Sequence, residues 1–119
     1  MAGIRKKIKD LESALKIFEE AAAKQAEANE QGDYKTGNKC VDQIDKSIDY
    51  IRQHNKMPDL FDFLIHPSVG VRIWTAAYLL PLFESESVAV LDKISKMQGI
   101  NGSVAKTTLE EWRKGNLKL

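Results

Sequence analysis

The sequence predicts an all-α fold of about six short helices, stacked as three antiparallel hairpins in an α-solenoid. Apolar residues recur at spacings of three and four along most of the chain, which is the helical period, and no stretch shows the strict alternation of a half-buried strand. Prolines at 58, 67 and 81 and glycines at 32, 99 and 115 divide the chain into segments of helical length. Because the breaks are short, successive helices should be antiparallel neighbours.

The first two segments, residues 4–31 and 34–54, predict the two longest helices. One face of the first carries Ile8, Leu11, Leu15, Phe18, Ala22 and Ala26. One face of the second carries Val41, Ile44, Ile48 and Ile51. Asp33 lies between them and is a candidate N-cap for the second helix, because its carboxylate can accept a free backbone N–H. Gly37 is unfavourable inside a helix, so it indicates a close helix contact or a later start.

The middle segments, residues 58–65 and 67–80, predict the centre of the fold. The first is apolar nearly all round, so we expect a short buried helix. The second begins with Pro67, which suits a first helical turn, and it has almost no polar face. We expect it to be the central helix, with a structural core formed by Val71, Arg72, Trp74, Ala76, Ala77 and Leu80.

The last two segments, residues 85–97 and 103–114, predict the third hairpin. Val88, Leu91 and Ile94 form the apolar stripe of one helix, and Ala105, Leu109 and Trp112 form that of the other. We expect Trp112 to fasten the last helix to the core. Gly115 stands where a helix C-terminal cap is expected.

Composition and charge exclude several classes of protein. The chain has 119 residues, of which 43% are hydrophobic and 29% charged, which fits a single soluble domain over residues 1–119. Eighteen basic and 17 acidic residues give a net charge of +1, whereas nucleic-acid-binding domains usually have a clear basic excess. No apolar run reaches the roughly 20 residues of a membrane span, and no signal-peptide pattern is present. We therefore expect a cytoplasmic protein that contacts neither nucleic acid nor membrane directly.

The cysteine and histidine content predicts no metal or cofactor. Cys40 is the single cysteine, which excludes an internal disulfide and fits a reducing compartment. His54 and His66 are the two histidines, too few for the usual Cys/His zinc site. Neither a Gly-rich phosphate loop nor a nucleophile elbow occurs, so we expect no catalytic residues and no enzyme activity.

The run from His66 to Leu80 resembles the core of a HEAT-type repeat. It has a turn, then Val71-Arg72, then the small pair Ala76-Ala77, then Leu80. Further parts of the pattern are Gly32-Asp33-Tyr34 with Asn38, Leu60…Leu64, Val88…Val90-Leu91 and Ala105…Leu109…Trp112…Gly115…Leu117. Together they cover roughly residues 30–118 and resemble a small bacterial HEAT-like family of unassigned function. Members of that family appear among immunity proteins encoded beside polymorphic toxins.

The resemblance implies a non-catalytic protein that binds and neutralises a cognate bacterial toxin. A nuclease of a contact-dependent growth inhibition system, or of a related system, is the expected target. The other interpretation is a general HEAT-like adaptor module with a housekeeping protein partner, because solenoids offer extended surfaces to many partners. HEAT-like DNA glycosylases represent an enzymatic alternative, but they are much longer and need a basic cleft. The sequence leaves the oligomeric state open.

The candidate partner-binding residues are three aspartates and one tyrosine. Asp42, Asp45 and Asp49 share one stripe of the second helix, and the second helix of each hairpin usually lines the concave surface of a solenoid. This stripe could face a basic toxin, or it could be a solvated surface relieved by neighbouring lysines and arginine. Tyr78 lies one turn after Trp74 and is a candidate because tyrosine combines an apolar ring with a polar tip.

Overall fold

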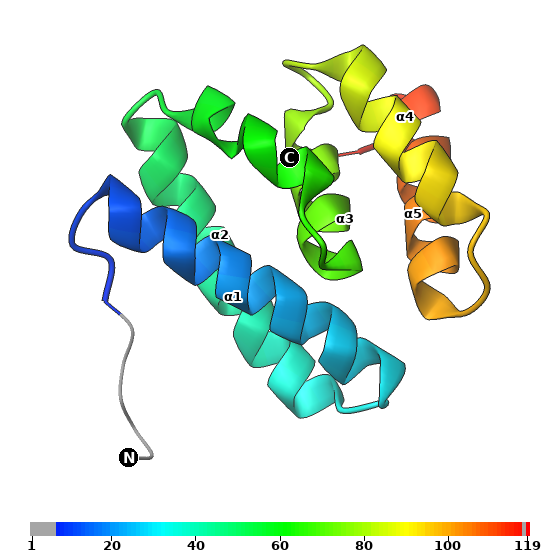
Figure 1. Cartoon of the computed structure of the whole chain (residues 1–119), viewed down its shortest axis with the longest axis horizontal. Helices are drawn as coiled ribbons and strands as arrows, with labels where there is room; N and C mark the ends of the chain where they lie inside the picture. The colour runs from blue at the N-terminus through cyan, green and yellow to red at the C-terminus, as the bar shows by residue number, and fades with distance from the viewer. Residues whose placement is uncertain (1–6, 118) are drawn as a thin grey trace.

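The computed structural model describes residues 7–117 and 119, and over these residues the chain forms six helical elements and no strand. In chain order they are α1 (Leu11–Glu30), α2 (Tyr34–Gln53), the 3-10 helix η1 (Met57–Ile65), α3 (Val69–Leu79), α4 (Glu84–Ser95) and α5 (Ile100–Arg113). Sequential neighbours pack as the pairs α1–α2, η1–α3 and α4–α5 (Figure 1). The predicted all-α fold is confirmed. In the part of the chain that is described, no helix is both long and apolar enough to cross a membrane.

Helix α1 begins later than the sequence pattern predicts. Asp10 is its N-cap: the backbone N–H of Ser13 donates to Asp10 Oδ1 (2.8 Å), and the backbone N–H of Asp10 donates to Ser13 Oγ (3.0 Å). This reciprocal capping box makes Leu11 the first residue of the helix. The hydrogen bond from the Ser13 backbone holds the pKa of Asp10 below its usual range. Residues 4–6 of the predicted helix lie outside the described residues.

Helix α2 begins as predicted, with Asp33 as its N-cap. The backbone N–H of Thr36 donates to Asp33 Oδ1 (3.2 Å). The helix starts at Tyr34, so Gly37 does not mark a late start; it is buried against α1. A Cβ atom at position 37 would lie 4.0 Å from the Cβ of Ala28, which is an ordinary contact. Gly37 therefore makes the expected helix contact, but the contact does not require glycine.

Residues 57–65 form a 3-10 helix, and only one side of it is buried. In a 3-10 helix, side chains three residues apart line up, so Met57 and Leu60 point into the core together with Leu64. Ile65 is 86% exposed and Phe61 38% exposed. The expectation of a helix buried on every side is therefore wrong. The apolar composition indicated burial, but this short helix has neighbours on only some of its sides, and residues on its other faces stay exposed.

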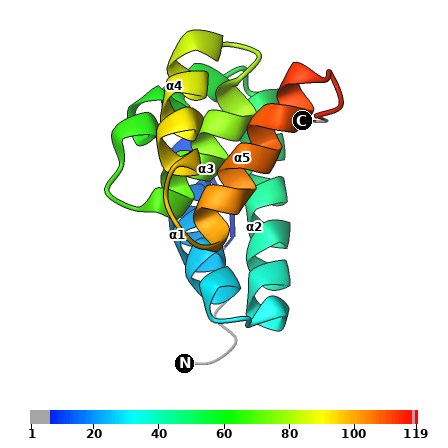
Figure 2. The same ribbon diagram turned by 90° about the vertical axis from the view of Figure 1, so that its right-hand side faces the viewer.

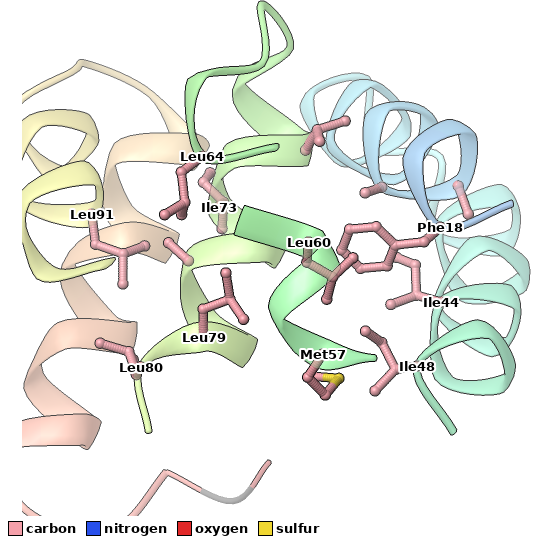
Figure 3. Packing of buried hydrophobic residues seen from close by; sticks show 14 of the residues in the cluster. Phe18, Ile44, Ile48, Met57, Leu60, Leu64, Ile73, Leu79, Leu80 and Leu91 are labelled. Atoms are coloured by element: carbon pink, nitrogen blue, oxygen red, sulfur yellow. The ribbon is translucent and has the colours of Figure 1, made fainter. Parts of the chain in front are cut away.

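The hydrophobic core is continuous across the three pairs. Val71, Ala76 and Leu80 have no exposed surface, as expected for the centre of the fold. Figure 3 shows Leu79 and Leu60 between Leu91 of α4 on one side and Phe18 of α1 on the other. Helix α3 consequently packs against both flanking pairs. Burial of the largest side chains in this cluster is the main favourable contribution to folding.

The packing of α3 on α1 depends on one glycine. A Cβ atom at Gly70 would lie 2.5 Å from the carbonyl oxygen of Ala22 and 2.6 Å from the Cβ of Ala26. Real Cβ atoms do not approach backbone oxygens that closely, so the first turn of α3 lies against the middle of α1 at a spacing that excludes any side chain at position 70. Ala22 and Ala26 belong to the predicted apolar face of α1, and their small size permits this approach.

The start of α5 is also displaced from its predicted position. The helix begins at Ile100 instead of residue 103, directly after Gly99, whose φ of 93° lies in the left-handed region that favours glycine. The side-chain amide of Asn101 donates to Glu30 Oε1 (2.5 Å), which connects the first turn of α5 to the end of α1. The third pair is thus fastened to the first pair at this end of the molecule.

Candidate protein-binding groove

The second helices of the three pairs, α2, α3 and α5, line one groove. Figure 2 shows these helices together on one side of the molecule. The groove has a volume of about 530 Å³, within the roughly 300–1,000 Å³ typical of ligand pockets. Its lining comes from the three helices and the C-terminal tail: Asp45, Ile48, Asp49, Arg52, Ile73, Trp74, Ala77, Tyr78, Val104, Thr108, Leu117 and Leu119.

Two aromatic rings of α3 form one wall of the groove. Trp74 and Tyr78 are one turn apart, and their rings stack with 6.2 Å between centroids and 24° between planes. The indole N–H of Trp74 donates to Gln25 Oε1 on α1 (3.0 Å). Because the indole N–H is already hydrogen-bonded to α1, Trp74 contributes aromatic ring surface to the groove. Trp74 is partly buried and packs against the core, so it contributes to both the core and the groove.

Tyr78 connects the aromatic wall to the acidic side of the groove. Its hydroxyl donates to Asp45 Oδ1 across a long contact of 3.4 Å. Partial burial of the phenol, followed by the negative charge of Asp45 and this hydrogen bond, raises the pKa of Tyr78 to about 12; the positive charge of Arg52 acts in the opposite direction. At neutral pH the groove therefore contains a neutral phenol that donates to a carboxylate.

The coupling between Tyr78 and Asp45 predicts a specific titration. Asp45→Asn should lower the pKa of Tyr78 from about 12 towards its ordinary value of 10, because it removes the charge that opposes a phenolate. Burial should still keep the pKa above 10. Since folding raises this pKa, the contribution of Tyr78 to stability is complete below pH 10 and is lost as the pH rises through about 12. Tyrosinate absorbance during an alkaline titration measures the pKa of Tyr78. The variants Tyr78→Phe and Tyr34→Phe identify the tyrosine that titrates last.

An unchanged titration in Asp45→Asn would contradict this interpretation. It would mean that burial alone sets the pKa of Tyr78 and that the aspartate is not held beside the phenol in solution.

The structure separates the three candidate aspartates. All three are exposed, but Asp45 and Asp49 line the groove with Tyr78, whereas Asp42 does not. Two of the aspartates predicted as partner-binding residues are thus brought together with the predicted tyrosine. Asp42 lies one turn nearer the start of α2 and faces solvent, as in the alternative interpretation of the stripe.

Several groove residues were not predicted from the sequence. The sequence indicates Arg52 only as a charge that relieves the acidic stripe, and no pattern in it points to Val104 or Thr108 of α5. The available signal was helical geometry: Arg52 lies three residues after Asp49 on the same face, and α5 occupies the same place in its pair as α2 does. Which faces of α2 and α5 meet across α3 depends on packing.

The predicted core residues of α3 differ in burial: some are fully buried, whereas Ala77 and Arg72 are only partly buried. Ala77 lines the groove and is partly exposed, so its assignment to the core was wrong. Consecutive helical residues point roughly 100° apart, so Ala76 and Ala77 cannot both face the centre of the core. Arg72 is partly buried, and its Nε has no hydrogen-bond partner among the described residues.

Trp112, His66 and Cys40 have structural positions outside the groove. The indole N–H of Trp112 donates to Glu84 Oε2 (2.7 Å), which joins α5 to the start of α4 and agrees with the predicted fastening role. His66 accepts the backbone N–H of Ser68 at Nδ1, so its Nε2–H donates to Glu19 Oε2 (2.7 Å) on α1. Cys40 is buried between α1 and α2, as expected for a small hydrophobic residue.

Comparison with known proteins supports the fold alone. The sequence matches no protein-family model and no curated protein. The structure is similar to the crystal structure of the protein RPA1889 from Rhodopseudomonas palustris CGA009, with a TM-score of 0.82 and 15% sequence identity. The match covers 95% of this chain and 99% of that chain. The two chains therefore share an all-helical architecture over nearly their whole lengths.

Proposed function

We propose that the chain is a non-catalytic binding protein and that a protein partner docks in the groove between α2, α3 and α5. The supporting observation is the combination of a stacked aromatic pair, Trp74 and Tyr78, with the carboxylates of Asp45 and Asp49 in one groove. Aromatic side chains dominate the energetics of protein interfaces, and charged groups at the edge direct association.

Within this class, we propose an immunity protein that neutralises a cognate bacterial toxin, with a nuclease as the expected target. The resemblance to a HEAT-like family with members among immunity proteins supports this choice. A nuclease has a basic cleft for its substrate, and a groove with Asp45 and Asp49 is complementary to such a surface. Toxin and immunity protein would then meet in the cytoplasm. The second candidate, an adaptor for a housekeeping protein, uses the same groove without a toxin.

The decisive experiment is a calorimetric titration of this protein with a catalytically inactive form of the protein encoded by the adjacent gene. We expect tight binding, with a Kd of roughly 10⁻⁸ M or below, and loss of the toxin's activity in the complex. No interaction with a toxin-like neighbour would refute the immunity proposal. A neighbour that binds but has no toxic activity would favour the adaptor. Excision of bases from DNA by the purified protein would refute the non-catalytic class.

Charge reversal tests whether the groove is the binding surface. Asp45→Lys with Asp49→Lys should preserve helicity, since both side chains are exposed, and should slow association with the partner about tenfold or more at low salt. Asp42→Lys is the control, to be compared with Asp45→Lys alone, because each reverses one charge on the same helix and only Asp45 lies in the groove. Stopped-flow association rates measure the effect. Equal rates for Asp45→Lys and Asp42→Lys would mean that the aspartates are only a solvated surface.

A further inference from the structure

We propose that the groove holds one arginine side chain of the protein partner, stacked on the Trp74–Tyr78 wall and paired with the carboxylates of Asp45 and Asp49. This inference rests on the proposed function in one respect, namely that the occupant is a protein segment. It goes further by naming the side chain that the groove recognises and the contacts that recognise it.

The shape of the wall suits a planar cation. The Trp74 and Tyr78 rings both line the groove, with 6.2 Å between centroids and 24° between planes, and the hydrogen bond from Trp74 to Gln25 holds the indole in place. A guanidinium group stacks on such a surface through cation–π and π contacts. Lysine has a compact ammonium group instead of a plane and would lose the stacking contribution.

The carboxylates are placed to receive the donors of the same guanidinium. The hydroxyl of Tyr78 donates to Asp45 Oδ1, so Asp45 lies at the edge of the aromatic wall. Asp49 follows one turn later on α2 and lines the same groove. Arginine presents five N–H donors in a fixed fork, which can serve two carboxylates while the plane remains stacked.

The charged side chains that line the groove favour an added cation. Among the ionised side chains that line it, Asp45 and Asp49 are negative and Arg52 is positive, which leaves one negative charge without compensation. Burying that charge under a partner would be costly unless the partner supplies a positive group. A nucleic-acid phosphate would add a second negative charge. Most of the remaining lining is apolar, including Ile48, Ile73 and Val104, and it accommodates an aliphatic neighbour of the arginine.

The test uses the peptide Ac-Leu-Arg-Leu-NH₂ and its citrulline analogue, which keeps the shape but lacks the charge. Binding is followed by NMR of the two tryptophan indole N–H groups. Trp112 is an internal reference, because its N–H donates to Glu84 and it does not line the groove. We expect the Trp74 signal to shift saturably, with a Kd on the order of 1 mM, while the Trp112 signal stays in place. The citrulline peptide should bind about tenfold more weakly, equivalent to about 1.4 kcal/mol.

Variants complete the test. Asp45→Asn with Asp49→Asn should weaken the arginine peptide about tenfold, equivalent to about 1.4 kcal/mol, and Asp42→Asn should leave its binding unchanged. Equal shifts of both tryptophan signals, or equal binding of both peptides, would overturn the inference. So would tighter binding of a DNA oligonucleotide than of the arginine peptide. An equal loss of peptide binding in Asp42→Asn and in the double variant would also overturn it. Toxin binding that tolerates the double variant would refute this inference and leave the proposed function standing. Binding of the arginine peptide without binding of the toxin would leave this inference standing and refute the proposed function.

Discussion

Ala76→Glu is expected to unfold the protein, whereas Ala77→Glu is expected to leave it folded. Ala76 has no exposed surface and lies in the cluster formed by α3 and its neighbours, so a glutamate there would place a carboxylate in the core without a partner. Such a group costs several kcal/mol, against a total stability of roughly 5–15 kcal/mol for a small domain. Far-UV circular dichroism and the urea midpoint measure the difference.

Ala77 is the matched control because it lies next to Ala76 in sequence and receives the same substitution. It lines the groove and is partly exposed, so a longer side chain can extend to solvent. The sequence alone placed Ala77 in the core, which predicts that this substitution would unfold the protein. If Ala77→Glu unfolded the protein while Ala76→Glu stayed soluble and helical, α3 would have to be rotated about its axis so that Ala77 faces the core.

Gly70→Ala is expected to lower stability by about 1–3 kcal/mol, although alanine is normally the better helix former. Its Cβ would lie 2.5 Å from the carbonyl oxygen of Ala22, and a backbone oxygen cannot move aside unless the two helices separate. The expected fall in melting temperature is roughly 4 °C for each kcal/mol. Calorimetry at matched pH gives the value.

Gly37→Ala makes the same change where a Cβ would fit. The nearest atom is the Cβ of Ala28 at 4.0 Å, so the gain in helix propensity should dominate and stabilise the protein by up to about 1 kcal/mol. Opposite signs for the two glycines would confirm that the α1–α3 approach is a specific tight contact. Stabilisation by both would show that α3 lies further from α1.

The helices could be predicted from the sequence to a large extent, because their signals are local. The three-and-four spacing around Phe18 and Ile44 identified the buried faces of α1 and α2, and Asp33 acts as the predicted cap. The start of α1 was missed because Ser13 replaces the usual Glu or Gln of a capping box. The 3-10 geometry of residues 57–65 was missed because apolar composition does not distinguish it from a buried α-helix.

The candidate groove could be predicted only in part. The stripe of Asp45 and Asp49 and the pair of Trp74 and Tyr78 are each visible as helical spacings, which are properties of one helix. Their meeting at the Tyr78–Asp45 contact joins residues 33 positions apart and depends on how α2 and α3 cross. The exclusion of Asp42 from the groove has the same origin.

The sequence by itself determined the all-helical class, the order of the helices and most of their apolar faces, because periodicity and caps act over a few residues. The tertiary structure alone decided which of two adjacent alanines is buried, that Gly70 but not Gly37 must lack a side chain, and which aspartates share a groove with an aromatic wall. These depend on the rotation and separation of helices packed side by side. A rotation of one residue, about 100°, exchanges core for surface, and local patterns do not specify it that finely.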